Sequence, residues 1–354
     1  MDVTTISGIN SFAIYIDNHT KYFFFGDFHG NNLNNCDKEF HCDYFNYTFT
    51  KTLTYNTSCT TIGPLLFNWL AYNKKNNIST SFLLEKSYKE DDLHPVFNQL
   101  VKNRKLKNYN NLSTIFPDKM SWLELVVYLS PTFAIKPDNI DIRFLRNERV
   151  SPFHLQFLYK LDNRNEIINF IKMMILNYKY ILLSLLTNYN LDPLFNFILS
   201  KLTGEFKIVF EHRILLINQL VNNQHIVGKT LSDLAMINAK RASDIIEFIT
   251  LLADEHMQNI TLNTDMNLES FLDYYVTVFT VLGAYTMDAY VLAKMFLNPK
   301  EVIVYTGAAH IEVYHLFFQN YLNLAPIYES TVDENKCITF EDLPLYLNIN
   351  EMRN

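Results

Sequence analysis

Short apolar runs alternate with helical patterns over the first 150 residues of the chain. Apolar residues at helical spacing predict helices over Thr60–Tyr72 and Lys119–Leu129. The apolar runs have the length and the aromatic and β-branched content of strands, and the polar triplet Asp17-Asn18-His19 predicts a turn between the first two. The predicted strands are Ser11–Ile16, Tyr22–Gly26, Thr80–Glu85 and Ile140–Phe144.

Residues 151–297 have a different texture, with apolar positions at i, i+3, i+4 and i+7 and few β-type runs. An apolar run typical of a strand occurs again at Glu301–Thr306, and a helical pattern over Ala309–Tyr321 follows it. A mostly helical segment therefore separates the last core strand from the earlier ones. The longest helical patterns in this segment cover Asn165–Leu186, Leu231–Ala253 and Leu268–Leu282.

This order of elements predicts a single α/β domain over residues 1–354. We expect a central, mostly parallel sheet flanked by helices, because short and continuously apolar strands suit a sheet that is covered on both faces. Residues 1–150 and 298–354 would form this core, with residues 151–297 as a large all-helical insertion before the last core strand. No linker rich in Pro, Gly or Ser divides the sequence into two independent domains.

Composition places the chain among globular proteins, since 49% of its 354 residues are hydrophobic and 19% are charged. The formal net charge is -7, and in the absence of a long basic stripe we expect no nucleic-acid partner. The most hydrophobic stretch, Ile171–Leu186, is interrupted by Lys172 and Lys179, which predicts a buried helix and no membrane span. The first 25 residues lack the pattern of a secretory leader, so a cytoplasmic protein with reduced thiols is expected.

Polar residues follow the predicted strands at the points where these strands end. Parallel strands would bring their carboxyl ends to one edge of the sheet, where the ligand sites of open α/β sheets form. Residues that are far apart in the sequence would then converge at this edge. The predicted catalytic residues are Asp27, His29, Glu85, Arg143 and His310.

Two imidazoles and two carboxylates can support two kinds of chemistry. His29, Glu85 and His310 could hold a divalent metal such as Mn, Co or Zn and leave a position open for water. Without a metal, a histidine with a carboxylate partner could act as general base on water, and Arg143 could neutralise a developing oxyanion. Each residue also has a purely structural interpretation, as a cap, a turn residue, a solvated strand end or an ion-pair partner.

Two Gly-x-x-His motifs, Gly26–His29 and Gly307–His310, each follow a strand-like run. With 8 Gly and 10 His in the chain, chance predicts only about 0.2 such matches. The Ala308-Ala309 pair inside the second motif favours a functional interpretation, because small residues permit close backbone approach at a strand-to-helix turn.

These motifs resemble those of the superfamily that joins the TIKI proteases, TraB-like proteins, ChaN-like proteins and the erythromycin esterases. In that superfamily one strand ends in Gly-Glu-x-His, a second ends in Glu and a late strand ends in Gly-x-x-His. The corresponding segments here are Gly26–His29, Leu83–Glu85 and Gly307–His310, and Met287–Ala293 resembles in position a helical family motif that begins with Arg. The resemblance implies hydrolysis, since the family includes metal-dependent peptidases and metal-free esterases that act through His.

The chain departs from this family pattern at two positions. Asp27 replaces the usual Glu, which shortens the carboxylate arm by one methylene group, and Met287 stands where the family has Arg. Arg143 would then have to supply the missing cation. Several runs, among them Leu84–Tyr88, also resemble proteins of large amoeba-infecting DNA viruses, which would place the protein in the host cytoplasm or the virion.

Three functions are compatible with these observations. The first is a hydrolase of peptide or ester bonds, acting on a small-molecule or peptide substrate with or without a divalent metal. The second is a metallophosphoesterase-like enzyme, because Gly-Asp-x-His-Gly also begins the calcineurin-like enzymes, although their further motifs do not occur here. The third is a catalytically degenerate viral protein that keeps the fold for host or virion interaction, which the lost family Arg favours.

Overall fold

The computed structural model describes residues 4–7, 9–27, 59–85, 135–141, 164–187, 190, 192–204, 207–208, 211, 226–258, 283–297, 299–331 and 337–340. The chain divides into two compact units. Unit 1 comprises Met1–Asn139 and Asn298–Asn354, and unit 2 comprises Ile140–Leu297. The predicted boundary at residue 150 and the predicted helices Lys119–Leu129 and Leu268–Leu282 lie outside the described residues.

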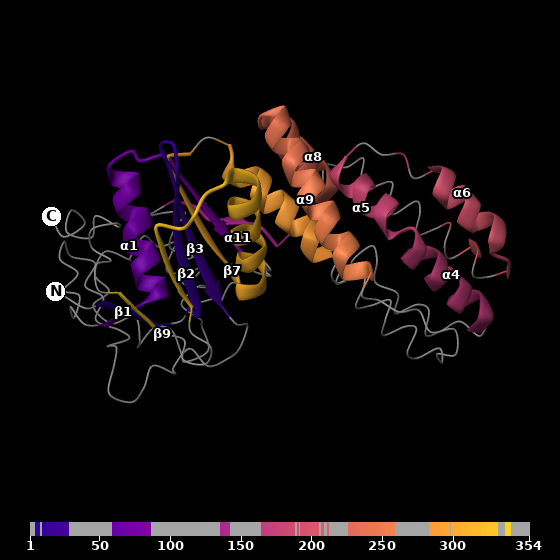
Figure 1. Cartoon of the computed structure of the whole chain (residues 1–354), viewed down its shortest axis with the longest axis horizontal. Helices are drawn as coiled ribbons and strands as arrows, with labels where there is room; N and C mark the ends of the chain where they lie inside the picture. The colour runs from indigo at the N-terminus through magenta and orange to yellow at the C-terminus, as the bar shows by residue number, and fades with distance from the viewer. Residues whose placement is uncertain are drawn as a thin grey trace, which may run out of the picture. The chain divides into compact units, whose positions relative to one another are not determined.

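Unit 1 contains a six-stranded sheet with the strand order β6-β5-β7-β3-β2-β8 (Figure 1). β7 runs parallel to both of its neighbours, β3 and β5, and β5 runs parallel to β6. β2 runs antiparallel to both β3 and β8, so the α/β class predicted from the sequence is confirmed but the sheet is mixed. The strands are β2 (Ser11–Asp17), β3 (Thr20–Asp27), β5 (Thr80–Leu84), β6 (Asp138–Asn139), β7 (Glu301–Gly307) and β8 (Tyr328–Thr331).

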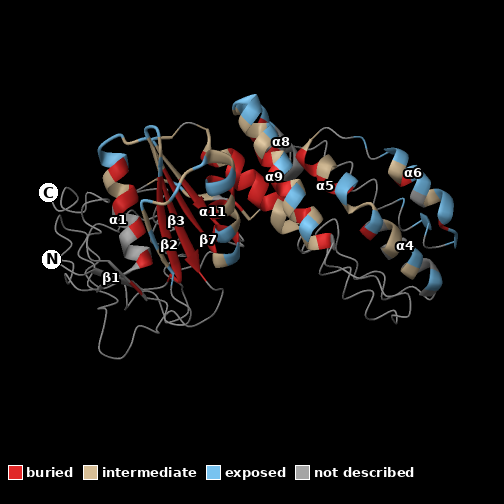
Figure 2. Cartoon of the chain, viewed as in Figure 1, coloured by how far each residue is buried: buried red, intermediate tan, exposed pale blue. Residues whose placement is uncertain are grey.

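Two helices cover opposite faces of this sheet (Figure 1). Side chains alternate between the faces along β3. Phe23 packs edge-on against Trp69 of the first helix, with ring centroids 4.4 Å apart, and Phe24 packs against Phe318 of the second at 5.2 Å. The strands β2, β3, β5 and β7 are buried along most of their length (Figure 2), which explains their continuous apolar sequence. The helices are α1 (Ile62–Lys75) and α11 (Ala308–Leu322).

The turn predicted between the first two strands is confirmed. Asn18 adopts a φ of 54°, the left-handed conformation that Asn tolerates better than most residues. Asn77, which follows α1, adopts the same φ of 54°. Lys74 and Lys75 lie in the last turn of α1, where positive charge complements the helix dipole.

A second sheet in unit 1 was not predicted from the sequence. It has three strands in the order β4-β1-β9, with β1 parallel to β4 and antiparallel to β9. Its strands are rich in Thr, Ser and Cys, and none is longer than four residues, so they carry little apolar signal. The strands are β1 (Thr4–Ser7), β4 (Cys59–Thr61) and β9 (Cys337–Phe340).

The described part of unit 2 is helical, but two helices that were predicted as continuous are each broken at an Asn. The Asn177 side chain donates to the Met173 carbonyl oxygen at 2.7 Å, and a new helix begins at the next residue. The Asn238 side-chain oxygen accepts the Lys240 N–H at 2.8 Å and so caps the following helix. The helices are α4 (Arg164–Leu176), α5 (Tyr178–Leu186), α6 (Asp192–Lys201), α8 (Ile226–Met236), α9 (Ala239–Gln258) and one over residues 283–295.

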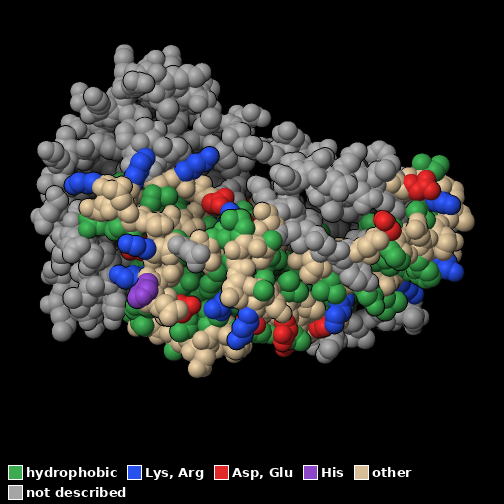
Figure 3. Space-filling view, turned by 90° about the horizontal axis from the view of Figure 1, so that it is seen from above, with side chains coloured by type: hydrophobic (Ala, Val, Ile, Leu, Met, Phe, Trp, Pro, Cys, Tyr) green, Lys and Arg blue, Asp and Glu red, His purple; other side chains and the backbone are tan. Residues whose placement is uncertain are grey.

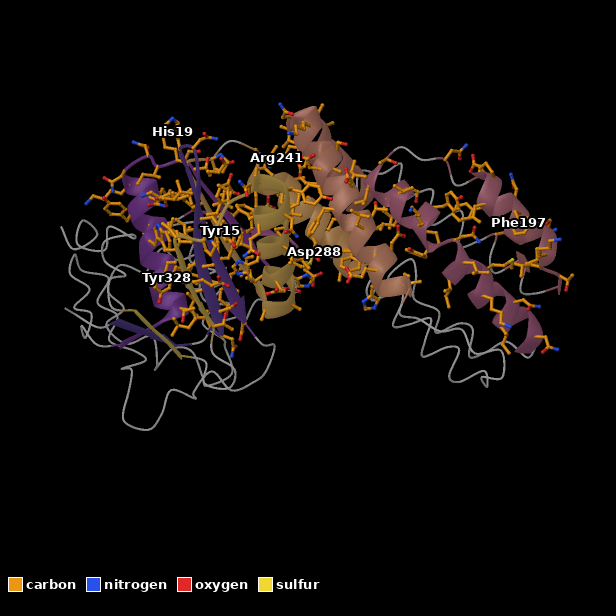
Figure 4. All side chains as sticks on the ribbon, viewed as in Figure 1. Tyr15, His19, Phe197, Arg241, Asp288 and Tyr328 are labelled. Atoms are coloured by element: carbon orange, nitrogen blue, oxygen red, sulfur yellow. The ribbon has the colours of Figure 1, made fainter. Side chains whose placement is uncertain are left out.

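Polar and charged side chains link the helices of unit 2. Asp254 of α9 accepts hydrogen bonds from the Tyr178 hydroxyl and, at 2.9 Å, from the Lys179 ammonium. The guanidinium carbon of Arg241, labelled in Figure 4, lies 4.5 Å from the Phe296 ring centroid. The family-like segment Met287–Ala293 is buried in the helix over residues 283–295. Of the helices described here, none combines the length and the apolar character needed to cross a membrane.

Candidate functional site

The carboxyl ends of β3, β5 and β7 meet at one edge of the six-stranded sheet. Asp27, the last residue of β3, pairs with Gly307, the last residue of β7. Glu85 directly follows β5, and its N–H donates to the Tyr305 carbonyl oxygen of β7 at 2.9 Å. This edge lies at the other end of the strands from the β2–β3 turn, where Figure 4 labels His19.

The Glu85 carboxylate is held by the residues that join β7 to α11. Its Oε2 accepts hydrogen bonds from the Thr306 hydroxyl and, at 2.8 Å, from the Gly307 N–H. Its Oε1 lies 3.8 Å from Nε2 of His310. The side chains of Glu85 and His310 are only 2% and 11% exposed, so their interaction takes place largely away from water, where charges interact more strongly.

The first turn of α11 favours this arrangement. Gly307 is the N-cap residue of α11, and no side chain of its own caps the helix. The Glu85 carboxylate, which follows another strand, accepts the N–H of this N-cap residue itself. Negative charge is favourable at a helix N-terminus because the backbone N–H groups point toward it. His310 lies in the same first turn, so one junction positions both members of the pair.

Gly26 lets α11 approach the sheet closely. A Cβ atom at this position would lie 2.1 Å from Ser11 Oγ and 3.2 Å from both Ala308 Cα and Ile311 Cγ1. A side chain here would displace the Ser11 side chain and press against the first turn of α11. The glycine of the first Gly-x-x-His motif thus lies against the first alanine of the second, a contact that the sequence alone did not predict.

Asp27 has a different partner on the other face of the sheet. Its Oδ2 accepts a hydrogen bond from the Tyr305 hydroxyl at 3.2 Å. Burial raises the pKa of Tyr305 well above its ordinary value, and the Asp27 charge adds to this effect, so the phenol stays protonated as a donor. Tyr305 pairs with Phe25 and lies on the α1 face, whereas Thr306 pairs with Gly26 and lies on the α11 face.

The structure therefore brings three of the five predicted catalytic residues to one sheet edge, in two groups. Glu85 and His310 form one group on the α11 face, and Asp27 belongs with Tyr305 on the α1 face. His29 and Arg143 lie outside the described residues.

Sequence reasoning missed the two hydroxyl groups that hold the carboxylates. Thr306 and Tyr305 were interpreted as ordinary members of an apolar strand. The signal that could have found Thr306 is a hydroxyl residue between an apolar strand and a Gly-x-x-His motif. Thr306 is buried there, and a buried hydroxyl requires a partner.

A divalent metal fits part of this site. If two ligand atoms are 3.8 Å apart and each lies about 2.1 Å from one ion, the angle between them at the ion is about 130°, which is wider than the tetrahedral angle. Glu85 Oε1 and His310 Nε2 have this separation. No group of three His, Cys, Asp or Glu residues suited to a metal occurs among the described positions, and the third predicted ligand, His29, lies outside them.

No protein-family model, curated protein or solved structure matches the chain. The superfamily resemblance of the two motifs therefore stays a prediction. The chemistry of the site has to be argued from the geometry of Glu85, Thr306, Gly307 and His310.

Proposed function

We propose that the protein is a hydrolase of peptide or ester bonds in which Glu85 and His310 form the reacting pair. One observation carries the proposal. Glu85 is a buried carboxylate with one oxygen fixed by two hydrogen-bond donors and the other directed at an imidazole nitrogen 3.8 Å away. A carboxylate held in this way orients a histidine for general base catalysis and stabilises the imidazolium that forms.

In the metal-free form of the mechanism, His310 accepts a proton from water. Its Nε2 lies 3.8 Å from Glu85 Oε1. We propose that the other ring nitrogen takes the proton as the water oxygen attacks the carbonyl carbon of the substrate. His310 then returns this proton to the leaving oxygen or nitrogen as the scissile bond breaks. Arg143 is the proposed partner of the negatively charged carbonyl oxygen, and Asp27 and His29 are proposed to complete the site.

In the metal-dependent form, His29, Glu85 and His310 would hold a divalent ion, and Asp27 would orient a water or a ligand histidine. The ion would supply Lewis acidity and would lower the pKa of a water toward neutral pH. Metal analysis of the protein, purified without a His tag, tests this form. We expect near-stoichiometric Mn, Co or Zn in the wild type and none in the folded variant that combines His29→Ala with His310→Ala. No metal in the wild type after incubation with these ions would rule this form out.

Hydrolysis itself is tested with a panel of neutral esters and short peptides, each with and without added Mn, Co or Zn. We expect His310→Gln to lower kcat/KM by about 10²-fold or more, the range found for general acid–base groups. His315→Gln is the matched control, because His315 is a buried histidine on the same helix that hydrogen-bonds to Tyr15. An inactive wild type would contradict the proposal and favour a role in host or virion interaction. Equal losses in both variants would contradict the assignment of His310 to the reacting pair.

A further inference from the structure

We infer that Thr306 is a positioning residue, which fixes the Glu85 carboxylate so that its second oxygen faces His310. This inference rests on the proposed function, in which Glu85 and His310 are the reacting pair. It assigns to Thr306 a role that acts through the Glu85 carboxylate. It also explains why position 85 carries Glu.

The length of the Glu85 side chain allows its carboxylate to contact both donors. The Glu85 N–H donates to the Tyr305 carbonyl oxygen at 2.9 Å, so the backbone of Glu85 is still in register with β7. From there its carboxylate extends to the Thr306 hydroxyl and the Gly307 N–H at the end of the neighbouring strand. An Asp side chain is shorter by one C–C bond, about 1.5 Å. It could not reach both donors without moving the strand, so Glu is required at this position.

A buried hydroxyl is costly at position 306. Thr306 is 1% exposed and is the last residue but one of β7, whose residues Val302–Tyr305 are also buried. A valine has nearly the same shape and is a good strand former, whereas a buried hydroxyl destabilises the fold unless it is hydrogen-bonded. The Glu85 carboxylate supplies that hydrogen bond. The threonine and the glutamate are therefore matched to each other.

The two donors also set which carboxylate oxygen lies near His310. Both act on Oε2, which leaves Oε1 at 3.8 Å from His310 Nε2. The Gly307 N–H belongs to the backbone and is kept by every substitution at position 307 except proline. The Thr306 hydroxyl is thus the part of this arrangement that a substitution can test.

Thermal unfolding of a double-mutant cycle tests the contact without any assay of activity. The variants are Thr306→Val, Glu85→Met and their combination, where Met keeps the length of Glu but removes the acceptor. We expect each single variant to lower Tm and the double variant to lose less than the two single losses combined, because the hydroxyl and its acceptor are then removed together. The Gly307 N–H loses its acceptor in Glu85→Met and in the double variant alike, so this loss cancels in the cycle. Additive losses would overturn the inference, whatever the activity.

Kinetics with Thr306→Ser as the conservative control then test the positioning role. We expect Thr306→Val to lower kcat by about 10- to 100-fold, the value of a hydrogen bond to a charged group, with KM unchanged. Thr306→Ser should keep kcat near its wild-type value, whereas Glu85→Asp should lower it. If the Tm losses of the double-mutant cycle are not additive but Thr306→Val keeps full activity, the positioning role alone is overturned. If the Tm losses are not additive and the wild type is inactive, the proposed hydrolysis is overturned, and the positioning role with it.

Discussion

His310 and His315 lie on the same helix, five residues apart, in different surroundings. His310 faces the Glu85 carboxylate, whereas Nδ1 of His315 lies 2.6 Å from the Tyr15 hydroxyl. Figure 4 labels Tyr15 on β2. Burial raises the pKa of Tyr15 to about 12, so this hydroxyl stays protonated near neutral pH.

The environment of His315 predicts a pH dependence of stability. Burial lowers the pKa of His315, although the charges of Glu329 and Glu312 act in the opposite direction. As pH falls below the ordinary value of about 6.5, the unfolded chain binds a proton before the folded one does, so folding stability decreases until the folded pKa is reached. We expect the urea midpoint of the wild type to fall between pH 7 and pH 5, with a flatter profile in His315→Gln. Parallel profiles would contradict this account.

The sequence predicted single site residues where the signal was local. Glu85 and His310 were found because each follows an apolar strand, and a polar residue at a strand end is visible in the sequence. The partners Thr306 and Tyr305 depend on which strand lies beside which, since the Glu85 contacts cross from β5 to β7. That pairing joins positions more than 200 residues apart and leaves no local pattern.

The elements of the chain were predicted well where one periodicity continued without interruption. β2, β3, β5, β7, α1 and α11 all lie within a few residues of their predicted bounds. The two long helical patterns of unit 2 were wrong as single helices, because Asn177 and Asn238 end one helix and begin another. An apolar stripe continues across such a break, so periodicity alone does not reveal it.

The contact between β3 and α11 makes a specific prediction about Gly26. Gly26→Ala places a Cβ against Ser11 Oγ and Ala308 Cα, and we expect a loss of about 1–3 kcal/mol in the free energy of unfolding, typical of overpacking. Combining it with Ser11→Ala should restore part of this stability, since the closest clash is with the Ser11 hydroxyl oxygen. Urea denaturation measures both effects. A Gly26→Ala variant as stable as the wild type would show that α11 does not approach β3 so closely.

At the scale of the whole molecule, the main sheet of unit 1 is built from both ends of the chain. β3 comes from the first 30 residues and β7 from residues after 300, and β7 is the shared neighbour of β3 and β5. The order of the strands could not be predicted, because it depends on contacts between these distant segments. Among the side chains coloured in Figure 3, lysine and arginine lie among acidic and apolar ones.

This topology predicts the effect of a truncation. A chain that ends after Leu297 lacks β7 and α11, and without β7 the strands β3 and β5 have no common neighbour. We expect the truncated chain to lose the cooperative unfolding transition of the sheet, monitored by near-ultraviolet circular dichroism of its buried aromatic residues. A truncated chain that keeps the full-length transition would contradict the described strand order.

The most direct test of the central claim is a kinetic double-mutant cycle between Glu85 and His310. If the two residues act as one unit, Glu85→Gln and His310→Gln should each lower kcat/KM strongly, and the double variant should lose little more than the more affected single variant. The assay uses the neutral ester or peptide that the wild type hydrolyses fastest. Losses that multiply, or a single variant with wild-type kcat/KM, would show that the pair at the carboxyl edge of the sheet is not the reacting centre.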